Sequence, residues 1–432
     1  MHQDSATGDA VIGLFLKRVM PLLGLMYLVA YIDRQNVSFA KLTMLGALNM
    51  SETAYGLGAS LFFIGYFLFE LPSNLVLGRV GARRWFARIM VSWGIVTILL
   101  GYTQNEAMFY VLRFLLGACE AGFFPGVLYL LTVWVPFSHR ARMVGWFMIA
   151  SVVANAVGAP ICGSLLDLDG VLGLQGWQWV FIATGGPAIV MGVVCWFALP
   201  DGPRDATFLS AAQKAWLQET IAAEDAAGHK TEHHNPLVAL MDGRVLLLAL
   251  TYVGFPLAAY GLSYWLPTVV RGFGVSNTVN GFINILPWIL TGFALWWLPR
   301  HSEKVGEKTW HIVLPVALGA VCLVASVIVP SNPVRFGLLC VAAACIFAAQ
   351  PIFWTLPSSF LRGASAAAGL AVINSVGNLG GFVAQNVVPM IKDATHSDLT
   401  PMFFLAGCLA FAGLMIFVVQ GVLGRARAVA AE

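Results

Sequence analysis

The sequence predicts an all-α integral membrane protein with twelve transmembrane helices in two pseudo-symmetric six-helix bundles. Three observations predict this class: the composition, the number of long apolar stretches, and a short repeat in equivalent places of the two halves. Of the 432 residues, 59% are hydrophobic and 10% are charged, whereas soluble domains carry about 25% charged residues. A soluble fold of this length cannot bury so much apolar surface, so lipid must be the solvent for most of the chain.

Twelve stretches approach the ~20 apolar residues that a helix needs to cross a bilayer. They lie at about 20–41, 55–77, 85–104, 108–131, 143–166, 177–199, 244–270, 279–299, 311–330, 335–354, 363–391 and 399–424. The stretches at 143–166 and 363–391 are rich in Gly, Ala, Ser and Asn. Small residues let helix backbones approach closely, so we expect these two helices to lie inside their bundles.

One long polar segment, 200–243, separates the first six stretches from the last six. We therefore expect an N-terminal bundle over 1–199 and a C-terminal bundle over 244–432, joined by this segment as a cytoplasmic linker. Within it, Ser210 and Gln213 have the spacing of a capping box, which predicts the start of a short interfacial helix. The apolar residues that could share one face of that helix are Leu209, Trp216, Leu217 and Ile221.

A repeat supports the division into halves. The sequence VGARRW at 80–85 precedes the third stretch, and VGEKTW at 305–310 precedes the ninth. The two hexapeptides occupy equivalent places in the two halves, which favours duplication over coincidence. Two related six-helix halves around a site near the bilayer midplane are typical of secondary transporters.

Neither the histidines nor the cysteines have the spacing of a metal site. His229, His233 and His234 lie in the linker without a Cys or a carboxylate cage beside them, which favours a solvated linker. The seven cysteines all fall in apolar stretches, and no CxxC or Cys/His ligand spacing is present. Buried cysteine usually acts as a small hydrophobe, so we expect no disulfide, no metal and no cofactor.

The basic residues predict the orientation in the membrane. With the N-terminus inside, fourteen Lys and Arg near the span ends fall on the cytoplasmic side and four on the opposite side, Lys41, Arg271, Arg335 and Lys392. This asymmetry fits the positive-inside rule. The first ten residues contain no Lys or Arg and do not form the basic start of a cleavable signal peptide. We expect a multi-pass protein of the cell inner membrane with both termini in the cytoplasm.

Four charged residues lie inside predicted spans, where each costs at least ~2.5–3.5 kcal/mol on insertion scales. Asp33 and Arg34 are adjacent in the first span, in the run YIDRQN. Arg113 and Glu120 lie seven residues apart in the fourth span, which places them on one helix face about 10 Å apart. Charged residues inside membrane spans are usually retained for a function.

Two interpretations of these charges stay open. They could be structural ion pairs between two helices, Asp33 with Arg113 and Arg34 with Glu120. Buried ion pairs stabilise poorly because desolvation offsets most of the attraction, so we favour a functional role. Two acids and two bases sum to zero, and protonation of a carboxyl leaves a net positive pocket that would accept an anion. The planar guanidinium of Arg matches a carboxylate with two parallel hydrogen bonds.

The second half has polar but uncharged candidates. Asn374 and Asn378 lie four residues apart in the eleventh span, so they share one helix face. They would suit substrate hydroxyls or a second carboxylate, or they could form hydrogen bonds between helices. Tyr66 in the second span and Tyr260 in the seventh could line a pocket or pack in the bundle.

These residues stand in motifs that resemble the anion:cation symporter family of the major facilitator superfamily. The carrying stretches are YLVAYIDRQNVSFA at 27–40, FFIGYFLFELPSNLVLGRVGARRWFARIM at 62–90, LRFLLGACEAGFFPG at 112–126 and AVINSVGNLGGF at 371–382. The resemblance covers essentially the whole chain and is closest to tartrate, phthalate and hydroxyphenylacetate permeases. It implies a major facilitator fold and uptake of a small organic carboxylate by symport with protons.

The resemblance also implies roles for individual residues. Asp33 and Glu120 match the family's proton-coupling acids, and Arg34 matches its substrate-binding arginine. Arg113 matches an arginine that pairs with the acids or assists binding. Tyr66 and either Asn374 or Asn378 match residues that line the substrate site, and we group Tyr260 with them. The implied partners are an organic acid, protons and lipid, with no nucleic acid, for a chain that acts as a monomer.

One position departs from the superfamily's pattern. The loop after the second span normally holds an acid before its basic pair, and here that position is Gly78. The acid usually helps to hold the outward-open state through charged contacts, so its loss weakens the expected gate. The basic residues of this gate remain: Arg79, Arg83 and Arg84.

Other functions are weaker alternatives. An exporter or antiporter of hydrophobic, drug-like compounds is one, because GAPICG at 158–163 loosely resembles a glycine-proline motif of drug antiporters. A membrane nutrient sensor that does not transport is another. An enzyme is not expected, since no nucleophile–base pair, metal motif or phosphate loop stands out. Aromatic acids, sugar acids and dicarboxylates all fit the candidate side chains.

Overall fold

The computed structural model describes residues 2–227, 242–357, 363–397 and 399–431, and within these ranges the regular structure is entirely helical. The helices that precede the linker are α1 (His2–Arg18), α2 (Met20–Leu48), α3 (Glu52–Val80), α4 (Ala82–Leu100), α5 (Glu106–Glu120), α6 (Phe123–Trp134), α7 (Phe137–Leu166) and α8 (Gly176–Ala198). The linker contains α9 (Ala211–Ala227). The later helices are α11 (Gly243–Arg271), α12 (Asn277–Ile283), α13 (Leu286–Val305), α14 (Thr309–Ile328), α15 (Asn332–Phe353), α16 (Gly363–Thr395) and α17 (Pro401–Ala431).

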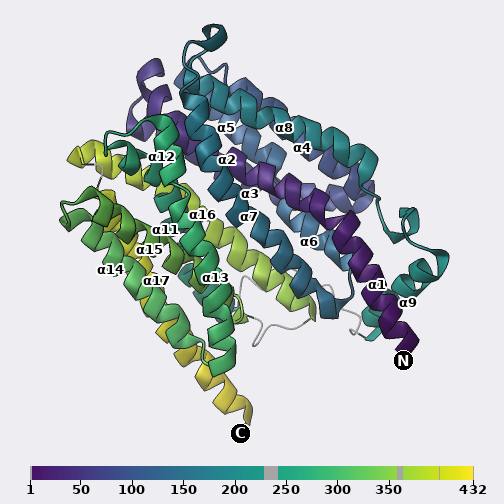
Figure 1. The fold of residues 1–432 in the computed structure, drawn as a ribbon. Coiled ribbons are helices and arrows are strands. Elements are labelled where there is room, and N and C mark those ends of the chain that lie inside the picture. The colour runs from purple at the N-terminus through teal and green to yellow at the C-terminus, as the bar shows by residue number, and fades with distance from the viewer. Residues whose placement is uncertain (1, 228–241, 358–362, 398, 432) are drawn as a thin grey trace.

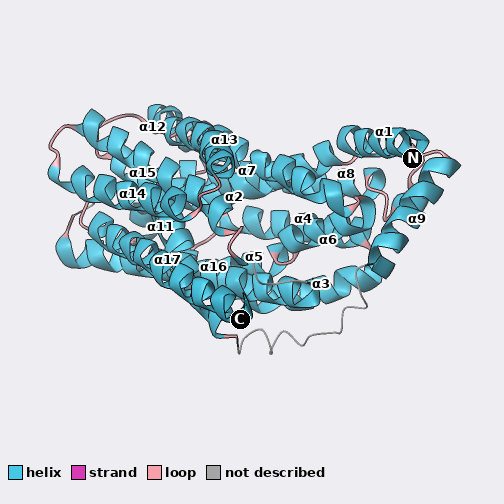
Figure 2. Cartoon of the chain, turned by 90° about the horizontal axis from the view of Figure 1, so that it is seen from below, coloured by secondary structure: helices cyan, strands magenta, loops and turns pink. Residues whose placement is uncertain are grey.

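The helices pack into two groups that lie side by side (Figures 1 and 2). In the first, α4 packs against α8, α3 against α5, and α2 against α7 and α8. In the second, α11 packs against α16 and α17, and α15 against α13 and α14. The groups meet along four helix pairs, α3 with α16, α7 with α12, α2 with α11, and α7 with α13. This confirms the predicted all-helical membrane fold of two bundles.

In the part of the chain that the structure describes, ten helical stretches are long and apolar enough to cross a membrane. The predicted third and eleventh spans, α4 and α16, are not among them. The first turns of α4 carry Arg83, Arg84 and Arg88, and α16 is rich in Gly, Ala, Ser and Asn. Both helices nevertheless pack lengthwise in their bundles, α4 against α8 and α16 against α11. Helices buried among other helices need less apolar surface than helices that face lipid.

Two predicted spans are interrupted. The fourth span divides into α5 and α6 at Ala121 and Gly122, and the eighth divides into α12 and α13 at Asn284 and Ile285. The sequence predicted each as one continuous helix. The first interruption has a local cause, because Gly122 has a φ of 88°, a conformation that only glycine adopts without strain.

The predicted repeat corresponds to two equivalent turns. Gly81 separates α3 from α4 with a φ of 91°, and Gly306 follows α13 with a φ of 71°. Both glycines are the second residue of the repeated hexapeptide. The repeat therefore places a glycine with a positive φ before the third helix of each half, although ψ differs, at 156° for Gly81 and 17° for Gly306.

The short helix predicted in the linker is present as α9. The Ser210 N–H donates to Gln213 Oε1 at 3.0 Å, and the Gln213 N–H donates to Ser210 Oγ at 3.3 Å, as a capping box requires. Leu209 and Leu217 are buried, and α9 packs against α1. The sequence did not predict α1, an additional helix whose buried face carries Val11, Ile12 and Phe15. The three linker histidines lie outside the described residues.

Both ends of the chain lie at one end of the molecule, called here the terminal side, and the opposite end is the far side (Figure 1). Contacts that join the two bundles gather at the far side. Asp167, which follows α7, accepts hydrogen bonds from the Asn277 side chain and the Thr278 N–H, both at 3.0 Å. Near the start of α3, Thr53 donates its N–H to Asp393 at 2.9 Å. These contacts hold the far side closed.

Candidate substrate and proton site

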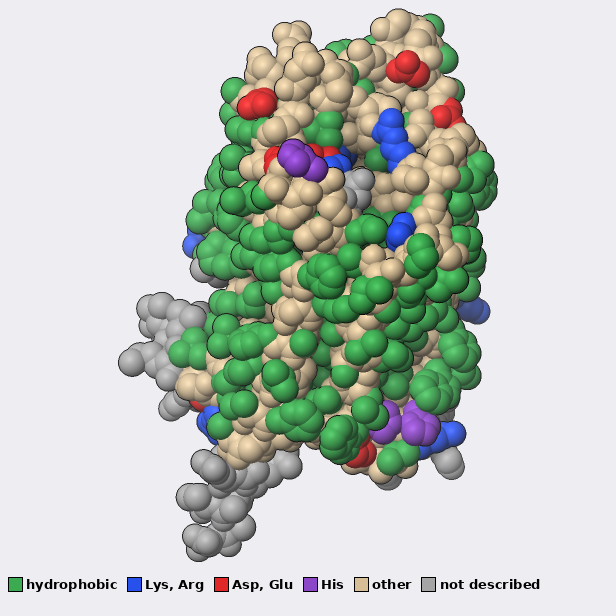
Figure 3. Space-filling model, turned by 90° about the vertical axis from the view of Figure 1, so that its left-hand side faces the viewer, with side chains coloured by type: hydrophobic (Ala, Val, Ile, Leu, Met, Phe, Trp, Pro, Cys, Tyr) green, Lys and Arg blue, Asp and Glu red, His purple; other side chains and the backbone are tan. Residues whose placement is uncertain are grey.

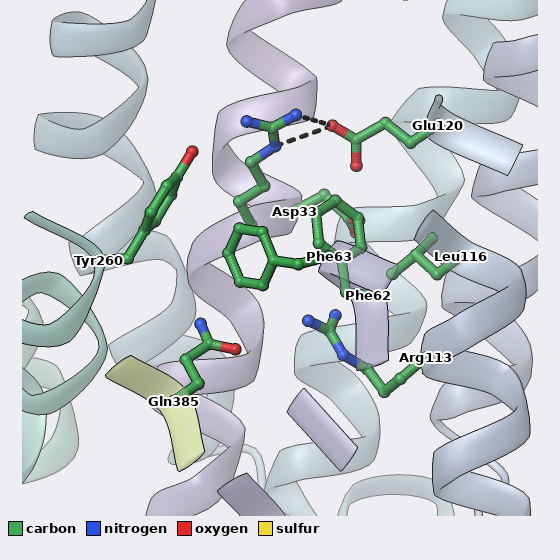
Figure 4. A pocket seen from close by; sticks show the side chains of 9 residues that line it. Asp33, Phe62, Phe63, Arg113, Leu116, Glu120, Tyr260 and Gln385 are labelled. Atoms are coloured by element: carbon green, nitrogen blue, oxygen red, sulfur yellow. Dashed lines mark hydrogen bonds and ion pairs between the residues drawn. The ribbon is translucent and has the colours of Figure 1, made fainter. Parts of the chain in front are cut away.

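A cavity lies between the two bundles in the middle of the molecule, at about 330 Å³ including its open mouth. Its lining comes from α2, α3 and α5 on one side and from α11 and α16 on the other. The lining residues are Asp33, Arg34, Phe62, Phe63, Arg113, Leu116, Glu120, Tyr260 and Gln385 (Figure 4). All four of the charged residues singled out within the predicted spans therefore line one cavity.

Arg34 and Glu120 form an ion pair across this cavity. The Nε and Nη2 atoms of Arg34 lie 2.8 and 2.6 Å from the same oxygen, Glu120 Oε1, and dashed lines mark both contacts in Figure 4. The Glu120 side chain is 1% exposed and that of Arg34 is 21% exposed. Arg34 thus reaches into the cavity while Glu120 is held behind it.

The second oxygen of Glu120, Oε2, is buried and has no hydrogen-bond partner among the described residues. A buried carboxylate oxygen without a donor is costly unless something binds it. A proton would satisfy it. Glu120 therefore has one oxygen bound to the cation and one that can receive a proton.

The break in the fourth span fixes the position of Glu120. Glu120 is the last residue of α5, and the carbonyl of Ala121 accepts a hydrogen bond from Ser73 Oγ at 2.7 Å. Ser73 packs so closely that a Cβ on Gly122 would lie 2.2 Å from its Oγ. An interrupted helix that ends at the charged site is typical of transporters, where freed backbone groups face a cavity.

Asp33 has a different environment from Glu120. It is 1% exposed, and it accepts hydrogen bonds from Asn36 Nδ2 at 2.8 Å and Thr97 Oγ1 at 3.2 Å. Asp33 and Arg113 were one of the two ion pairs considered from the sequence, and that pair does not form. Arg113 instead donates to the Ala59 carbonyl at 2.9 Å. Asn36 of the same helix and Thr97 of α4 bond Asp33 instead. Of the two ion pairs left open from the sequence, the one that forms is Arg34 with Glu120.

Aromatic rings surround the Arg34 guanidinium. Its central carbon lies 5.2 Å from the centre of the Tyr31 ring, 5.7 Å from Phe62 and 5.6 Å from Tyr66. Cations over aromatic faces at such distances are stabilised without losing their charge. Tyr66 was predicted from the sequence, whereas Tyr31 and Phe62 were not. Tyr260 comes from the other bundle and packs 5.0 Å from the Phe63 ring.

The predicted asparagines of α16 do not line the cavity. Asn374 and Asn378 are half-buried on α16, and the cavity's residue from that helix is Gln385. Gln385 was missed, although it lies seven residues beyond Asn378 and so continues the same helix face. Its side-chain oxygen, Oε1, is buried and has no hydrogen-bond partner among the described residues. In Figure 4, Gln385 and Tyr260 lie across the cavity from Glu120.

The three gate arginines lie at the terminal side, away from the cavity. Arg83 forms an ion pair with Asp201 at 3.3 Å, and its N–H donates to the same carboxylate at 2.9 Å. Arg79 and Arg84 are exposed. Gly78 is exposed too, and a Cβ there would meet nothing within 4 Å, so the missing acid is not explained by a lack of space.

Comparison with known proteins agrees with this architecture. Residues 23–385 match the family model described as Major Facilitator Superfamily. A quinolone resistance transporter of Acinetobacter baumannii is 43% identical over 94% of both chains. A putative tartrate transporter of Agrobacterium vitis is 44% identical over 93% of both chains. The resemblance to tartrate-type permeases predicted from the sequence is therefore confirmed.

The fold has a solved counterpart. A bacterial homologue of the human lysosomal transporter Spinster, in an inward-facing and occupied conformation, superimposes with a TM-score of 0.74 at 16% identity, over 94% of this chain and 97% of that one. At such low identity the likeness concerns the fold alone. Together with the family match and the cavity between two helical bundles, it leads to one conclusion: this chain is a membrane transporter, not an enzyme, and belongs to the major facilitator superfamily.

Proposed function

We propose that this protein is a proton-coupled symporter that imports a small organic carboxylate by alternating access. The observation that carries the proposal is the Arg34–Glu120 ion pair on the wall of a cavity between the two bundles. Such a pair can exchange its internal carboxylate for that of a substrate. The bundles formed by 1–199 and 244–432 would rock about this site, with 200–243 as their cytoplasmic linker.

Glu120 would couple proton binding to substrate binding. When Glu120 is ionised, its Oε1 occupies two donors of Arg34. Protonation at the unpartnered Oε2 removes the negative charge and weakens this hold. Arg34 can then bind a substrate carboxylate with its planar pair of donors. Asp33 would be the second proton-binding acid, and Arg113 would add positive charge to the same cavity.

The empty transporter would return with its acids ionised. Asp33 and Glu120 then balance Arg34 and Arg113, so the cavity carries no net charge while the bundles rock back. A substrate bound without a proton would leave an excess negative charge inside the membrane, which is costly. The charge balance therefore favours movement of the empty site, or of the site that holds a substrate together with one proton for each of its negative charges.

Neutral groups around the cavity support a hydroxylated or dicarboxylic substrate. Tyr260 and Gln385 face the site from the second bundle, and Gln385 Oε1 is an unused acceptor. An acceptor suits a substrate hydroxyl. A relative named as a putative tartrate transporter makes tartrate, which has two carboxylates and two hydroxyls, the first compound to test.

We propose that the terminal side faces the cytoplasm. The excess of Lys and Arg near the terminal side would place that side in the cytoplasm of a cell inner membrane. The far side, which is closed in this structure, would face outward. We further propose that the monomer is the transporting unit, because one chain supplies every residue of the cavity.

Uptake by proteoliposomes tests the proposal. With an acidic exterior, the wild-type protein should accumulate labelled tartrate above its external concentration. Glu120→Gln cannot exchange a proton, so it should lose accumulation driven by the pH gradient while retaining tartrate exchange without a gradient. Accumulation by Glu120→Gln at the wild-type level would remove Glu120 from proton coupling, and binding of no organic acid at all would refute the substrate class.

An exporter of hydrophobic compounds is the second candidate. Two observations favour it: a relative named as a quinolone resistance transporter, and the Phe62 and Phe63 rings in the cavity lining. A thermal-shift screen of the purified protein against organic acids and quinolones, at acidic and neutral pH, separates the candidates. Stabilisation by acids that is larger at acidic pH supports the symporter, and stabilisation by quinolones alone supports the exporter.

A further inference from the structure

A second charged space lies at the far side, away from the central cavity. It measures about 570 Å³ including its mouth and is lined by residues of both bundles. The lining residues are Lys41, Leu42, Leu45, Glu52, Thr268, Arg271, Gly272 and Lys392. Figure 3 shows basic and acidic side chains gathered around a hollow at the upper end of the molecule, above an apolar belt.

The charges that line this space do not balance. Lys41, Arg271 and Lys392 are three cations, and Glu52 is the one acid of the lining. Glu52 contacts both lysines, with its two oxygens at 2.9 Å from Lys41 Nζ and 2.9 Å from Lys392 Nζ. Arg271 donates to the Leu42 carbonyl. The neighbouring acid, Asp393, is engaged by the Thr53 N–H at 2.9 Å and does not line the space.

Positive charge is concentrated here more than anywhere else on this side. The far-side ends of the spans carry four basic residues in all, and three of them line the space, the exception being Arg335. They come from three helices of two bundles, α2, α11 and α16. Charges of one sign that converge from separate helices repel one another, so this arrangement is unfavourable unless an anion compensates it.

Lys41 is held rigidly. Its side chain is 1% exposed, and its Nζ lies 3.4 Å from the centre of the Trp265 ring. An ammonium group over an aromatic face is attracted by the ring, so this contact directs the Lys41 side chain. It provides a fixed positive wall, whereas the more exposed Arg271 and Lys392 can adjust to a ligand.

The space also contains an unused polar atom. Thr268 Oγ1 is buried and has no hydrogen-bond partner among the described residues. Buried hydroxyls are nearly always bonded, so one without a protein partner that faces a cationic space can donate to a bound anion. A hydroxyl can donate to a carboxylate as the cations do.

We propose that this space is an outer anion site, at which a small organic carboxylate binds before it enters the central cavity. Lys41 lies seven residues after Arg34 on α2, which places it on the same helix face about 10 Å nearer the far side. The substrate would therefore pass from the Lys41–Arg271–Lys392 cluster to Arg34. Its carboxylate would compete with Glu52 for Lys392, loosening one contact that joins the bundles at the moment a substrate is present.

This site rests on the proposed function for the identity of its ligand, so its test must read the outer space alone. Trp265 contacts Lys41 and reports on the outer space. The protein would be labelled with 5-fluorotryptophan, and the ¹⁹F signal of Trp265 would be assigned as the one lost in Trp265→Phe. Tartrate and sulfate would each be titrated against this signal, and tartrate uptake would be measured in parallel.

We expect tartrate to shift the Trp265 signal with saturation. Arg271→Gln and Thr268→Val should each raise the tartrate Kd read at this signal at least fivefold. Two control variants should leave that Kd unchanged: Arg335→Gln, which removes the basic residue outside the space, and Arg34→Gln, which removes the central arginine. Arg271 is exposed, and Thr268→Val preserves shape, so neither variant should impair folding.

Three results would overturn the outer site. A shift abolished by Arg34→Gln but kept in Arg271→Gln would show that Trp265 reports on the central cavity. Sulfate binding as tightly as tartrate would refute the organic carboxylate class. A silent Trp265 signal in a protein that takes up tartrate would remove the outer site and leave the transport function standing. Conversely, saturable binding at Trp265 without uptake would support the outer site and refute the proposed transport function.

Discussion

At the scale of single residues, the site depends on which oxygen of each acid is already bonded. Glu120 gives one oxygen to Arg34 and keeps the other without a donor, whereas both oxygens of Asp33 accept hydrogen bonds from neighbours. The two acids are equally buried but differently supported. We infer that substrate binding at Arg34 changes the protonation of Glu120 directly, whereas it changes the protonation of Asp33 through the net charge of the cavity.

Arg34→Lys tests the geometry of the guanidinium. Lysine keeps the charge but cannot present the planar pair of donors that Arg34 offers to a carboxylate. Loss of one hydrogen bond to a charged group costs about 1.5–3 kcal/mol, so we expect the KM for tartrate uptake to rise by roughly tenfold or more. Arg300→Lys, at an exposed position, is the control and should transport normally. An unchanged KM in Arg34→Lys would mean that the substrate binds elsewhere.

At the scale of elements, the broken fourth span is the feature that the sequence concealed. The run LRFLLGACEAGFFPG contains Gly122, but the sequence does not show that this glycine adopts a positive φ. In the structure Gly122 has a φ of 88° and Ser73 of α3 bonds the Ala121 carbonyl, and the helix stops at Glu120. The adjacent span thus completes a turn that the fourth span could not hold alone. This is why the charged residue ends a helix instead of lying in its middle.

Gly122→Ala should disrupt this turn. A left-handed conformation costs an alanine about 1–2 kcal/mol, and its Cβ would lie 2.2 Å from Ser73 Oγ. We expect a lower thermal unfolding temperature in detergent and a loss of transport. Gly186→Ala is a matched control, since a Cβ at that position of α8 meets nothing within 4 Å. Equal unfolding temperatures and equal transport in the two variants would show that the turn at Gly122 is not required.

The contact between α7 and α12 has a predictable pH dependence. Burial acts to raise the pKa of Asp167, but hydrogen bonds from Thr278 and Asn277 outweigh it and hold the pKa below its usual value. A lowered pKa means that the contact is fully present above the ordinary aspartate pKa and is lost as the pH falls through the lowered one. It should therefore be intact from pH 7 to pH 5.

Cross-linking measures this dependence. A cysteine pair placed across the far ends of α7 and α12 should cross-link equally at pH 7 and pH 5 in an otherwise wild-type protein. In Asp167→Asn, which lacks the charge, cross-linking should be reduced at both values. A strong fall between pH 7 and pH 5 in the wild-type background would contradict the lowered pKa.

At the scale of the whole molecule, the two bundles are held together at the far side by charged contacts over a packed interface. Glu52 links Lys41 of its own bundle to Lys392 of the other, and glycines let the helices approach. A Cβ on Gly56 would lie 2.3 Å from the Gln385 carbonyl. Opening toward the far side requires these contacts to separate together, so each one shifts the balance between the two end states.

Glu52→Gln should favour opening of the far side. It leaves the buried Lys41 without its carboxylate, and removing one partner of a buried pair destabilises by about 3–5 kcal/mol. Opening hydrates Lys41 and relieves this cost. A cysteine at position 385, in a background without the native cysteines, should then react faster with a membrane-impermeant maleimide applied from the far side. Glu106→Gln, an exposed acid on the same side, should not change the rate.

The sequence by itself determined the membrane class, the two-bundle fold, the helix α9 in the linker, and all four charged residues of the cavity: Asp33, Arg34, Arg113 and Glu120. Long apolar stretches, a repeated turn sequence and charged residues inside predicted spans are local properties, so the sequence shows them directly. Only the tertiary structure decided that Asp33 bonds Thr97 and not Arg113, that α5 ends at Glu120, and that Gln385 replaces Asn374 and Asn378 in the lining. Each of these depends on which helix happens to lie opposite, and the rotation of one packed helix against another is set by side chains far apart in sequence.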